Sequence, residues 1–335
     1  IVIVVFNMID NSTRTVKILV TGGSGFIGSN LLQSLSRNFD YDLLNIDIAM
    51  IDRPEFQSVT TICDIKDRMK LERIITDFNP NYIIHLAART DLNGKKLSDY
   101  SSNIEGVRNI VEIASQLSCL KKILITSSML VCKPGYQPVS NDDYCPHTLY
   151  GKSKVLTEQI ARSIPLKCQW AFLRPTSIWG PGFKAPYRNF FDMVANRRYF
   201  HIGNRACTKT YGYIGNTVYQ IERILFHTDT TTNGEVYYLG DPPLNIEKWA
   251  NHISEQMGVR IHRVPFSLIK IAGWIGDGLK MLGISFPMTS FRLKNMTTNN
   301  ILDLSKTFQI APNPPYSELE GIKRTIEWLR TSKKN

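Results

Sequence analysis

Hydrophobic and polar positions alternate with two different periods over the first half of this 335-residue chain. Five-residue apolar runs are separated by longer stretches in which apolar residues return every three or four positions, as in strands alternating with helices. The predicted strands are 16–20, 42–46, 58–62, 82–86 and 122–126, and two of the intervening helices are predicted at 67–77 and 99–118. Such alternation predicts an α/β fold, a Rossmann-type doubly wound parallel sheet covered on both faces.

The strict alternation ends near Trp179. Beyond it, helices predicted at 246–257, 267–282 and 317–329 are joined by short strands and prolines. We therefore expect one domain at 15–179 and a smaller C-terminal α/β lobe at 180–330, from which some segments return to the first domain. The apolar stretch 264–287 contains Lys270, Asp277 and Lys280, which favours a core or lobe-packing helix over an anchor at a membrane surface.

Closely spaced glycines connect the first strand to its helix. Glycines allow a tight turn and a close backbone approach to phosphates, and the start of a helix attracts negative charge. The second strand then leads to Asp47, nineteen residues after Gly28. A carboxylate there can accept hydrogen bonds from a ribose diol and would repel a 2′-phosphate. The order of these features predicts a dinucleotide site that prefers NAD to NADP.

A second group of residues is suited to proton transfer. Tyr150 and Lys154 lie four positions apart at the start of a predicted helix, so they share a face of it. A phenol has an ordinary pKa of about 10, and a neighbouring ammonium favours its ionised form. Ser128 follows the fifth strand, where its hydroxyl can hold a substrate oxygen. These residue types predict proton exchange with a carbinol oxygen while a nicotinamide cofactor carries the hydride.

From Val16 to about Leu329 the chain resembles an extended short-chain dehydrogenase/reductase of the NAD-dependent epimerase/dehydratase family, whose members act on nucleotide sugars. The resemblance implies a catalytic role for Ser128, Tyr150 and Lys154, with Ser127 as a close alternative to Ser128. It implies contacts with NAD by Gly22, Gly25, Phe26, Ile27, Gly28, Asp47, Asp64, Ile65, Leu86, Ala87, Ala88, Asn103, Tyr150, Lys154 and Pro175. It implies substrate contacts by Ser127, Ser128, Ser177, Lys209 and Arg292.

Departures from the family pattern narrow the expected reaction. Met129 and Leu130 follow Ser128, where 4,6-dehydratases carry an Asp-Glu pair and 3,5-epimerases place a Cys two positions after the Ser. Apolar side chains cannot serve as those acids and bases, so both reactions are disfavoured. We expect epimerisation of a nucleotide sugar at C4 through a 4-keto intermediate. A nucleotide-sugar or 3β-hydroxysteroid-type dehydrogenase or reductase, and a non-catalytic dinucleotide-binding regulator, remain as alternatives.

Composition and charge add several expectations. The formal net charge of +11 comes from Lys and Arg spread along the chain, so we expect anionic small molecules rather than nucleic acid as partners. The six cysteines are far apart and no His or Cys has metal-ligand spacing, which favours a reduced, cytoplasmic protein without a metal site. We expect no membrane insertion. By analogy with the family, helices 99–118 and 150–163 would pair across a homodimer.

Overall fold

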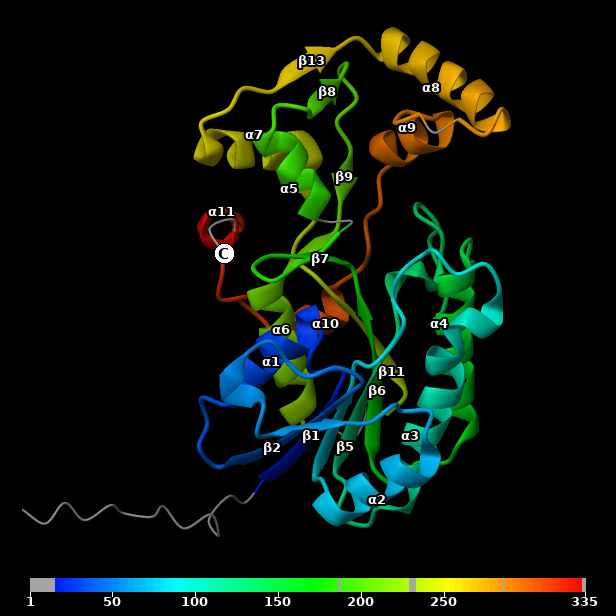
Figure 1. The fold of residues 1–335 in the computed structure, drawn as a ribbon, viewed down its shortest axis with the longest axis vertical. Coiled ribbons are helices and arrows are strands. Elements are labelled where there is room, and N and C mark those ends of the chain that lie inside the picture. The colour runs from blue at the N-terminus through cyan, green and yellow to red at the C-terminus, as the bar shows by residue number, and fades with distance from the viewer. Residues whose placement is uncertain (1–15, 186–187, 229–232, 285, 333–335) are drawn as a thin grey trace, which may run out of the picture.

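A seven-stranded parallel sheet forms the core of the part of the molecule drawn in the lower half of Figure 1. The structure, a computed structural model, describes residues 16–185, 188–228, 233–284 and 286–332. The sheet has the strand order β11-β6-β5-β4-β1-β2-β3, and every neighbouring pair is parallel. Its strands are β1 Val16–Thr21, β2 Tyr41–Asp47, β3 Thr60–Ile62, β4 Tyr82–His85, β5 Lys122–Thr126, β6 Gln169–Pro175 and β11 Glu235–Leu239. The Rossmann-type α/β fold predicted from the sequence is confirmed.

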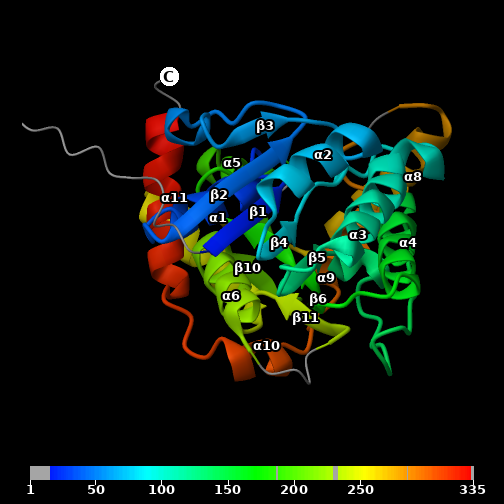
Figure 2. The same cartoon turned by 90° about the horizontal axis from the view of Figure 1, so that it is seen from below.

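Helices cover both faces of this sheet (Figure 2). They are α1 Phe26–Leu35, α2 Arg68–Phe78, α3 Val107–Gln116, α4 Leu149–Ser163 and α6 Ile214–Phe226. Successive strand residues point to opposite faces, so Ile18 and Val20 pack with α1 and α6 while Leu19 packs with α2, α3 and α4. The near-continuous apolar runs that marked the strands in the sequence are thus buried on two sides.

The chain beyond residue 180 contributes to the sheet as well as to a second lobe. Strand β11 pairs in parallel with β6, and α6 packs on β5 and β11. The lobe itself contains the short strands β7 Ser177–Trp179, β8 Phe200–Ile202, β9 Thr208–Lys209, β10 Tyr211–Tyr213, β12 Leu244–Asn245 and β13 His262–Val264. Its helices are α5 Arg188–Ala195, α7 Ile246–Met257, α8 Phe266–Met281, α9 Ser290–Thr297, α10 Ser305–Ile310 and α11 Glu318–Ser332.

Helix α8 packs through one face only. Ile269, Gly273 and Gly276 are buried, and a Cβ on Gly276 would lie 1.8 Å from the carbonyl oxygen of Met288, just before α9. The opposite face of α8, including Trp274, is exposed. The helix packs within the second lobe through the side that faces α9, while the other side of a sequence that is apolar nearly all round is left exposed. Among the described residues, every helix is too short or too polar to cross a bilayer.

A buried ion pair joins α4 to β6. Both Glu158 and Arg174 are at most 1% exposed, and the guanidinium Nε and Nη2 each donate to the carboxylate at 2.8 Å. Other hydrogen-bonding groups of the two side chains have partners as well. Tyr144 donates to Glu158, and Arg174 donates to the hydroxyl of Tyr238. A buried pair is tolerated only when its lone pairs and protons are satisfied in this way.

Removing one charge of this pair should destabilise the fold strongly. In Glu158→Gln the guanidinium of Arg174 stays buried without a counter-charge, so we expect a loss of about 3 kcal/mol or more in the free energy of unfolding. Urea unfolding followed by circular dichroism measures the loss. The control is Glu320→Gln, whose partner Arg324 is half exposed, with an expected loss below about 1 kcal/mol. Equal losses in the two variants would contradict the assignment.

Candidate active site

The turn between β1 and α1 requires glycine at two positions. Gly22 has φ +77°, and a Cβ there would lie 2.6 Å from the amide nitrogen of Ala87. A Cβ on Gly28 would lie 2.3 Å from the carbonyl oxygen of Gly22. Gly25 is the N-cap of α1, and no side chain caps the helix. The first amides of α1 therefore present donors and a partial positive charge at the carboxyl edge of the sheet.

Two side chains of β2 fix this turn. Asn45, which is fully buried, accepts from the amide of Gly23 at 2.8 Å, and Asp47 accepts from the amide of Ser24 at 2.9 Å. The second oxygen of Asp47 accepts from Ile48 at 2.7 Å. The predicted ribose acid thus lies beside the glycine turn. Asn45 was missed in the sequence, although a polar residue inside the apolar run 43–46 is a signal that could have identified it.

The loop after β4 forms the next part of the edge. The amide of Leu86 donates to the carbonyl of Thr21, and the amide of Ala87 donates to the hydroxyl of Thr21 at 3.3 Å. Asn103 is buried, and its side chain exchanges two hydrogen bonds with the backbone of Arg89 and donates to Ser153 at 2.9 Å. Its amide is therefore engaged with the protein, and it acts on the site by tying this loop to α4.

The other residues expected near the cofactor lie around this edge in different environments. Asp64 follows β3, pairs with Lys66 at 3.5 Å and is partly exposed, whereas Ile65 is buried against Gly106. Phe26 and Ala88 are partly buried, and Pro175 ends β6. Ile27 is also partly buried in the first turn of α1.

Helix α4 carries the predicted acid–base pair on its buried side. Tyr150 is 8% exposed and Lys154 is 3% exposed. The ammonium of Lys154 donates to the carbonyl of Thr126, the last residue of β5, at 2.8 Å. Burial lowers the pKa of Lys154 to about 8, against the opposing effect of Glu158 one turn further on. Gly151 allows the close approach, because a Cβ there would lie 2.2 Å from the carbonyl oxygen of Leu130.

Hydroxyl groups gather at the end of β5. Ser128 is buried, and its oxygen accepts from the amide of Leu130 at 3.1 Å, which leaves its proton free to donate. The hydroxyl oxygens of Thr126 and Ser127 are buried and have no hydrogen-bond partner among the described residues. Unpaired buried polar atoms are costly, and a bound ligand or an ordered water would supply the missing hydrogen bonds. Ser127 and Ser128 both fit the expected contact with a substrate oxygen.

His85 at the end of β4 is structural. It is buried, its Nδ1 lies 2.7 Å from the hydroxyl of Thr21, and burial together with the charge of Lys154 lowers its pKa to about 3. The ring is thus neutral at physiological pH and cross-links β4 to β1.

The expected substrate residues belong to three elements of the second lobe. Ser177 is buried in β7. Lys209 in β9 is partly buried and donates to the carbonyl of Asn295 on α9 at 2.7 Å, and burial lowers its pKa. Arg292 on α9 is exposed and donates to the carbonyl of Pro287 at 2.9 Å. The structure therefore links Lys209 to α9, the helix that bears Arg292.

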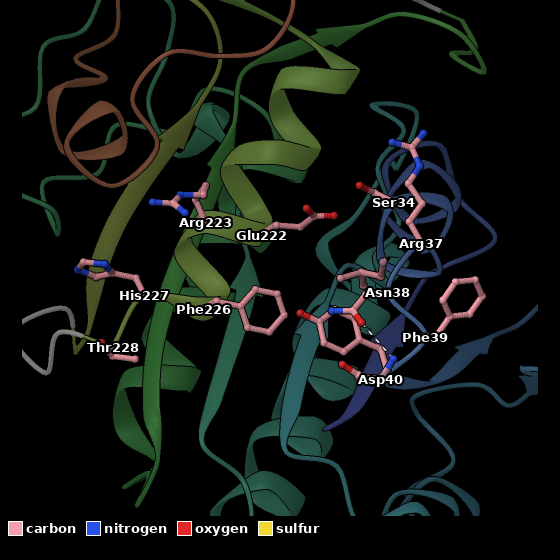
Figure 3. Close-up of a pocket in the computed structure, with 12 residues that line it drawn as sticks. Ser34, Arg37, Asn38, Phe39, Asp40, Glu222, Arg223, Phe226, His227 and Thr228 are labelled. Carbon is pink, nitrogen blue, oxygen red and sulfur yellow. Dashed lines mark hydrogen bonds between the residues drawn. The ribbon is translucent and has the colours of Figure 1, made fainter. Parts of the chain in front are cut away.

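One hollow of the described structure lies away from this edge. A cavity of about 680 Å³ opens between the end of α1, the start of β2 and the end of α6, and is lined by Tyr41, Glu222 and Phe226 among others (Figure 3). Residue 41 begins β2, so this cavity lies at the amino ends of the strands. Ligands of doubly wound sheets bind at the carboxyl ends. The cavity is therefore distinct from the candidate active site.

Comparison with known proteins settles the family. A model described as the NAD dependent epimerase/dehydratase family matches residues 18–240, which include the glycine turn, Tyr150, Lys154 and β11. The chain belongs to this family. Resemblance to the extended short-chain dehydrogenase/reductases, inferred from the motifs, is confirmed.

Similar proteins include both epimerases and hydroxysteroid dehydrogenases. The chain is 26% identical over 322 residues to N-acetyl-alpha-D-glucosaminyl-diphospho-ditrans,octacis-undecaprenol 4-epimerase of Escherichia coli O157:H7, covering 93% of this chain and 95% of that protein. It is also 26% identical to a 3-beta-hydroxysteroid dehydrogenase of Mycolicibacterium neoaurum, with 87% of this chain and 84% of that protein covered. The crystal structure of UDP-glucuronic acid 4-epimerase from Bacillus cereus, in complex with UDP-glucuronic acid and NAD, superposes with a TM-score of 0.72. There the identity is 20%, and the coverage is 94% of this chain and 99% of that one.

The family's cofactor is NAD, and the residues present fit it. The uncapped start of α1 suits a pyrophosphate, and Asp47 at the end of β2 suits a ribose diol. The unpaired hydroxyls of Thr126 and Ser127 lie at the end of β5, beside the position where Lys154 is held. No other described element combines these features.

The carboxylate of Asp47 should set the preference between the two dinucleotides. In Asp47→Asn the oxygen that accepts from Ser24 can remain, but the negative charge that repels a 2′-phosphate is lost. We expect the ratio of the Kd for NADP to the Kd for NAD to fall by about tenfold, the effect of about 1.4 kcal/mol. Titration calorimetry measures both constants. The exposed Asp52→Asn serves as a control and should leave the ratio unchanged, and an unchanged ratio in Asp47→Asn would contradict the role.

Proposed function

We propose that this family member is a nucleotide-sugar epimerase that inverts C4 through a transient 4-keto sugar. The observation that carries the proposal is the bond from the Lys154 ammonium to the Thr126 carbonyl. It anchors the buried face of α4, which Tyr150 shares, at the carboxyl end of β5. Ser128 lies two residues after Thr126, and this arrangement supports a shared role of the three residues in proton transfer at a carbinol.

Each residue has a distinct role in the proposed reaction. When bound, NAD supplies a hydride acceptor and donor. Tyr150 takes the proton of the C4 hydroxyl as the keto sugar forms and returns it after the sugar has turned over. Lys154 stabilises the phenolate by its charge, and Ser128 donates a hydrogen bond to the C4 oxygen. The balance is closed within one turnover, because the proton and hydride removed from the sugar are both given back.

The residues after Ser128 support epimerisation at C4. Met129, Leu130 and Val131 form a short 3-10 turn, η5, and Leu130 packs its backbone against α4. No carboxylate or thiol occupies these positions, so elimination of water from the ring lacks its acid and base. A reaction that needs only Ser, Tyr, Lys and NAD remains.

The substrate proposed is a sugar attached to a diphosphate. The family resemblance implies substrate contacts by Lys209 and Arg292, and their positive charges suit the phosphates of such a substrate. The Escherichia coli relative is named for a sugar joined by a diphosphate to undecaprenol, whereas the Bacillus cereus structure contains a UDP-sugar. A sugar diphosphate is common to both. A hydroxysteroid is the second candidate, favoured by the similarity to the Mycolicibacterium enzyme.

Cofactor balance separates these two functions. Purified enzyme preloaded with NAD is incubated with UDP-N-acetylglucosamine or with a 3β-hydroxysteroid, without further cofactor. An epimerase converts many equivalents of the sugar because the hydride returns, whereas a dehydrogenase stops after one equivalent of NADH appears. Mass spectrometry and absorbance at the NADH band follow the two products. Net NADH formation from the steroid, without turnover of the sugar, would overturn the proposal.

Loss of the phenol should remove turnover and spare cofactor binding. In Tyr150→Phe the ring packing against Tyr100 can persist, but the proton acceptor is gone. We expect kcat to fall by about 10²-fold or more while the Kd for NAD changes little. Tyr219→Phe, on the remote face of α6 with its hydroxyl bonded to Pro312, is the control and should keep full activity. Full activity in Tyr150→Phe would refute the assignment.

Loss of the charge of Lys154 should make the catalytic rate fall at alkaline pH. Its pKa of about 8 means that the ammonium is present below this pH and is lost above it. Because the charged form stabilises the phenolate, we expect kcat to decline as the pH rises through about 8. The residual rate of Lys154→Met should lack this decline. A rate that stays constant in the unaltered enzyme up to pH values well above 8 would argue against the role.

A further inference from the structure

One face of α8 is apolar and uncovered in the described structure. Six side chains on this face, between 49% and 88% exposed, form what we call the outer face of α8: Leu268, Ile271, Trp274, Ile275, Met281 and Leu282. Of the seventeen large apolar side chains exposed among the described residues, eight fall in 268–291. Such a concentration marks an interaction surface rather than scattered surface residues. Figure 1 shows α8 at the extremity of the second lobe, beyond α9.

The spacing of these residues explains why they lie together. Positions 268, 271, 275 and 282, and positions 274 and 281, recur at intervals of three, four and seven, so they share one side of the helix. Ile269, Gly273 and Gly276 lie on the opposite side and pack toward α9. The helix thus has one face for its neighbour in the fold and a second apolar face for a partner.

The charges around α8 and α9 are mostly positive. Between residues 266 and 297 there are four basic side chains, those of Lys270, Lys280, Arg292 and Lys294, and one acidic residue, Asp277. Asp277 already accepts a hydrogen bond from the amide of Ser290 at 3.1 Å. The ammonium of Lys270 lies 5.0 Å above the ring of Trp274. An apolar face that contains Trp and is flanked by Lys is typical of helices at the interface of an anionic bilayer.

Length and charge decide between the possible occupants of this face. Helix α8 has 16 residues, about 24 Å at 1.5 Å per residue, which is shorter than the hydrocarbon core of about 30 Å. It can therefore lie in the interface plane. A second copy docked on the same face would bring the Lys270 of each copy into the contact, because a twofold contact is self-complementary. An anionic lipid surface attracts the same charges.

We propose that the outer face of α8 docks the enzyme on the surface of an anionic phospholipid bilayer. The apolar side chains enter the headgroup boundary, and Lys270, whose ammonium lies above the ring of Trp274, contacts lipid phosphates. The sequence favours a core or lobe-packing helix over an anchor at a membrane surface for segment 264–287, and this proposal assigns α8 the surface role in addition to its packing against α9. The proposal is independent of the reaction assigned above, since it concerns a surface that contains none of the proposed catalytic residues.

Cosedimentation of the full chain with lipid vesicles tests the proposal. We expect the protein to pellet with vesicles that contain phosphatidylglycerol and to remain soluble with vesicles of phosphatidylcholine alone. Ile271→Glu combined with Ile275→Glu should lower the partition coefficient at least about tenfold. The reason is that two apolar side chains, exposed in the free protein, would no longer be buried in the bilayer. Met69→Glu combined with Leu319→Glu is the matched control, since both residues are exposed on α2 and α11. Circular dichroism confirms that each variant is folded.

Two further measurements identify the contacts. Removing one charge in Lys270→Ser should weaken binding to the anionic vesicles by about fivefold and reduce its dependence on salt. Vesicle binding should shift the fluorescence of Trp274 to shorter wavelength, so the shift disappears in Trp274→Phe and persists in Trp328→Phe. These outcomes locate the contact on α8 rather than elsewhere on a basic protein.

Either of two results would overturn the proposal. The first is that the unaltered protein fails to pellet with anionic vesicles, or that the double glutamate variant pellets equally well. The second is that light scattering shows an oligomer that the same variant dissociates while no vesicle binding is seen, in which case a second copy covers the face. Neither measurement uses substrate, so failure here leaves the proposed reaction untouched.

Discussion

The ionisable groups that α4 turns toward the sheet constrain the whole active-site edge. Lys154 places its ammonium on the carbonyl of Thr126, and Glu158 one turn later pairs with Arg174 on β6. Burying a cation and an anion without partners would cost several kcal/mol each. The helix can therefore adopt only the rotation that satisfies both. That rotation determines which side of α4 faces the sheet, and Tyr150 lies on that buried side.

A second layer of polar contacts holds the loops at this edge. Asn45 binds the glycine turn, His85 binds Thr21, and Asn103 ties the loop after β4 to Ser153. None of these side chains needs to touch a ligand to matter, because each fixes backbone that does. Glycine is required at Gly22 and Gly28 for a related reason, since the turn approaches neighbouring backbone too closely for a Cβ. The edge that fits NAD is thus built largely from main chain, which is insensitive to the identity of most side chains.

The proposed reaction and the proposed attachment use different parts of the molecule. The carboxyl edge of the sheet carries the proposed acid–base groups, whereas the outer face of α8 lies at the far end of the second lobe. Helix α9 connects the two regions, since it packs against α8 and accepts the hydrogen bond of Lys209. A protein docked through α8 would present this lobe, with its candidate phosphate-binding cations, close to the lipid surface. The excess of positive charge then serves both an anionic substrate and an anionic surface.

The sequence by itself determined the parallel sheet, the glycine turn with Asp47, and the spacing of Tyr150 and Lys154. These features are local, since a strand, a turn or one helical turn is specified by neighbouring residues. Only the tertiary structure showed that Glu158 pairs with Arg174, that Asn103 is engaged by the loop after β4, and that β11 joins β6. Each depends on residues brought together from distant parts of the chain. The exposed face of α8 could not be predicted from the sequence. Apolar periodicity indicates which side chains favour burial, but it does not show whether another element of the fold packs over them.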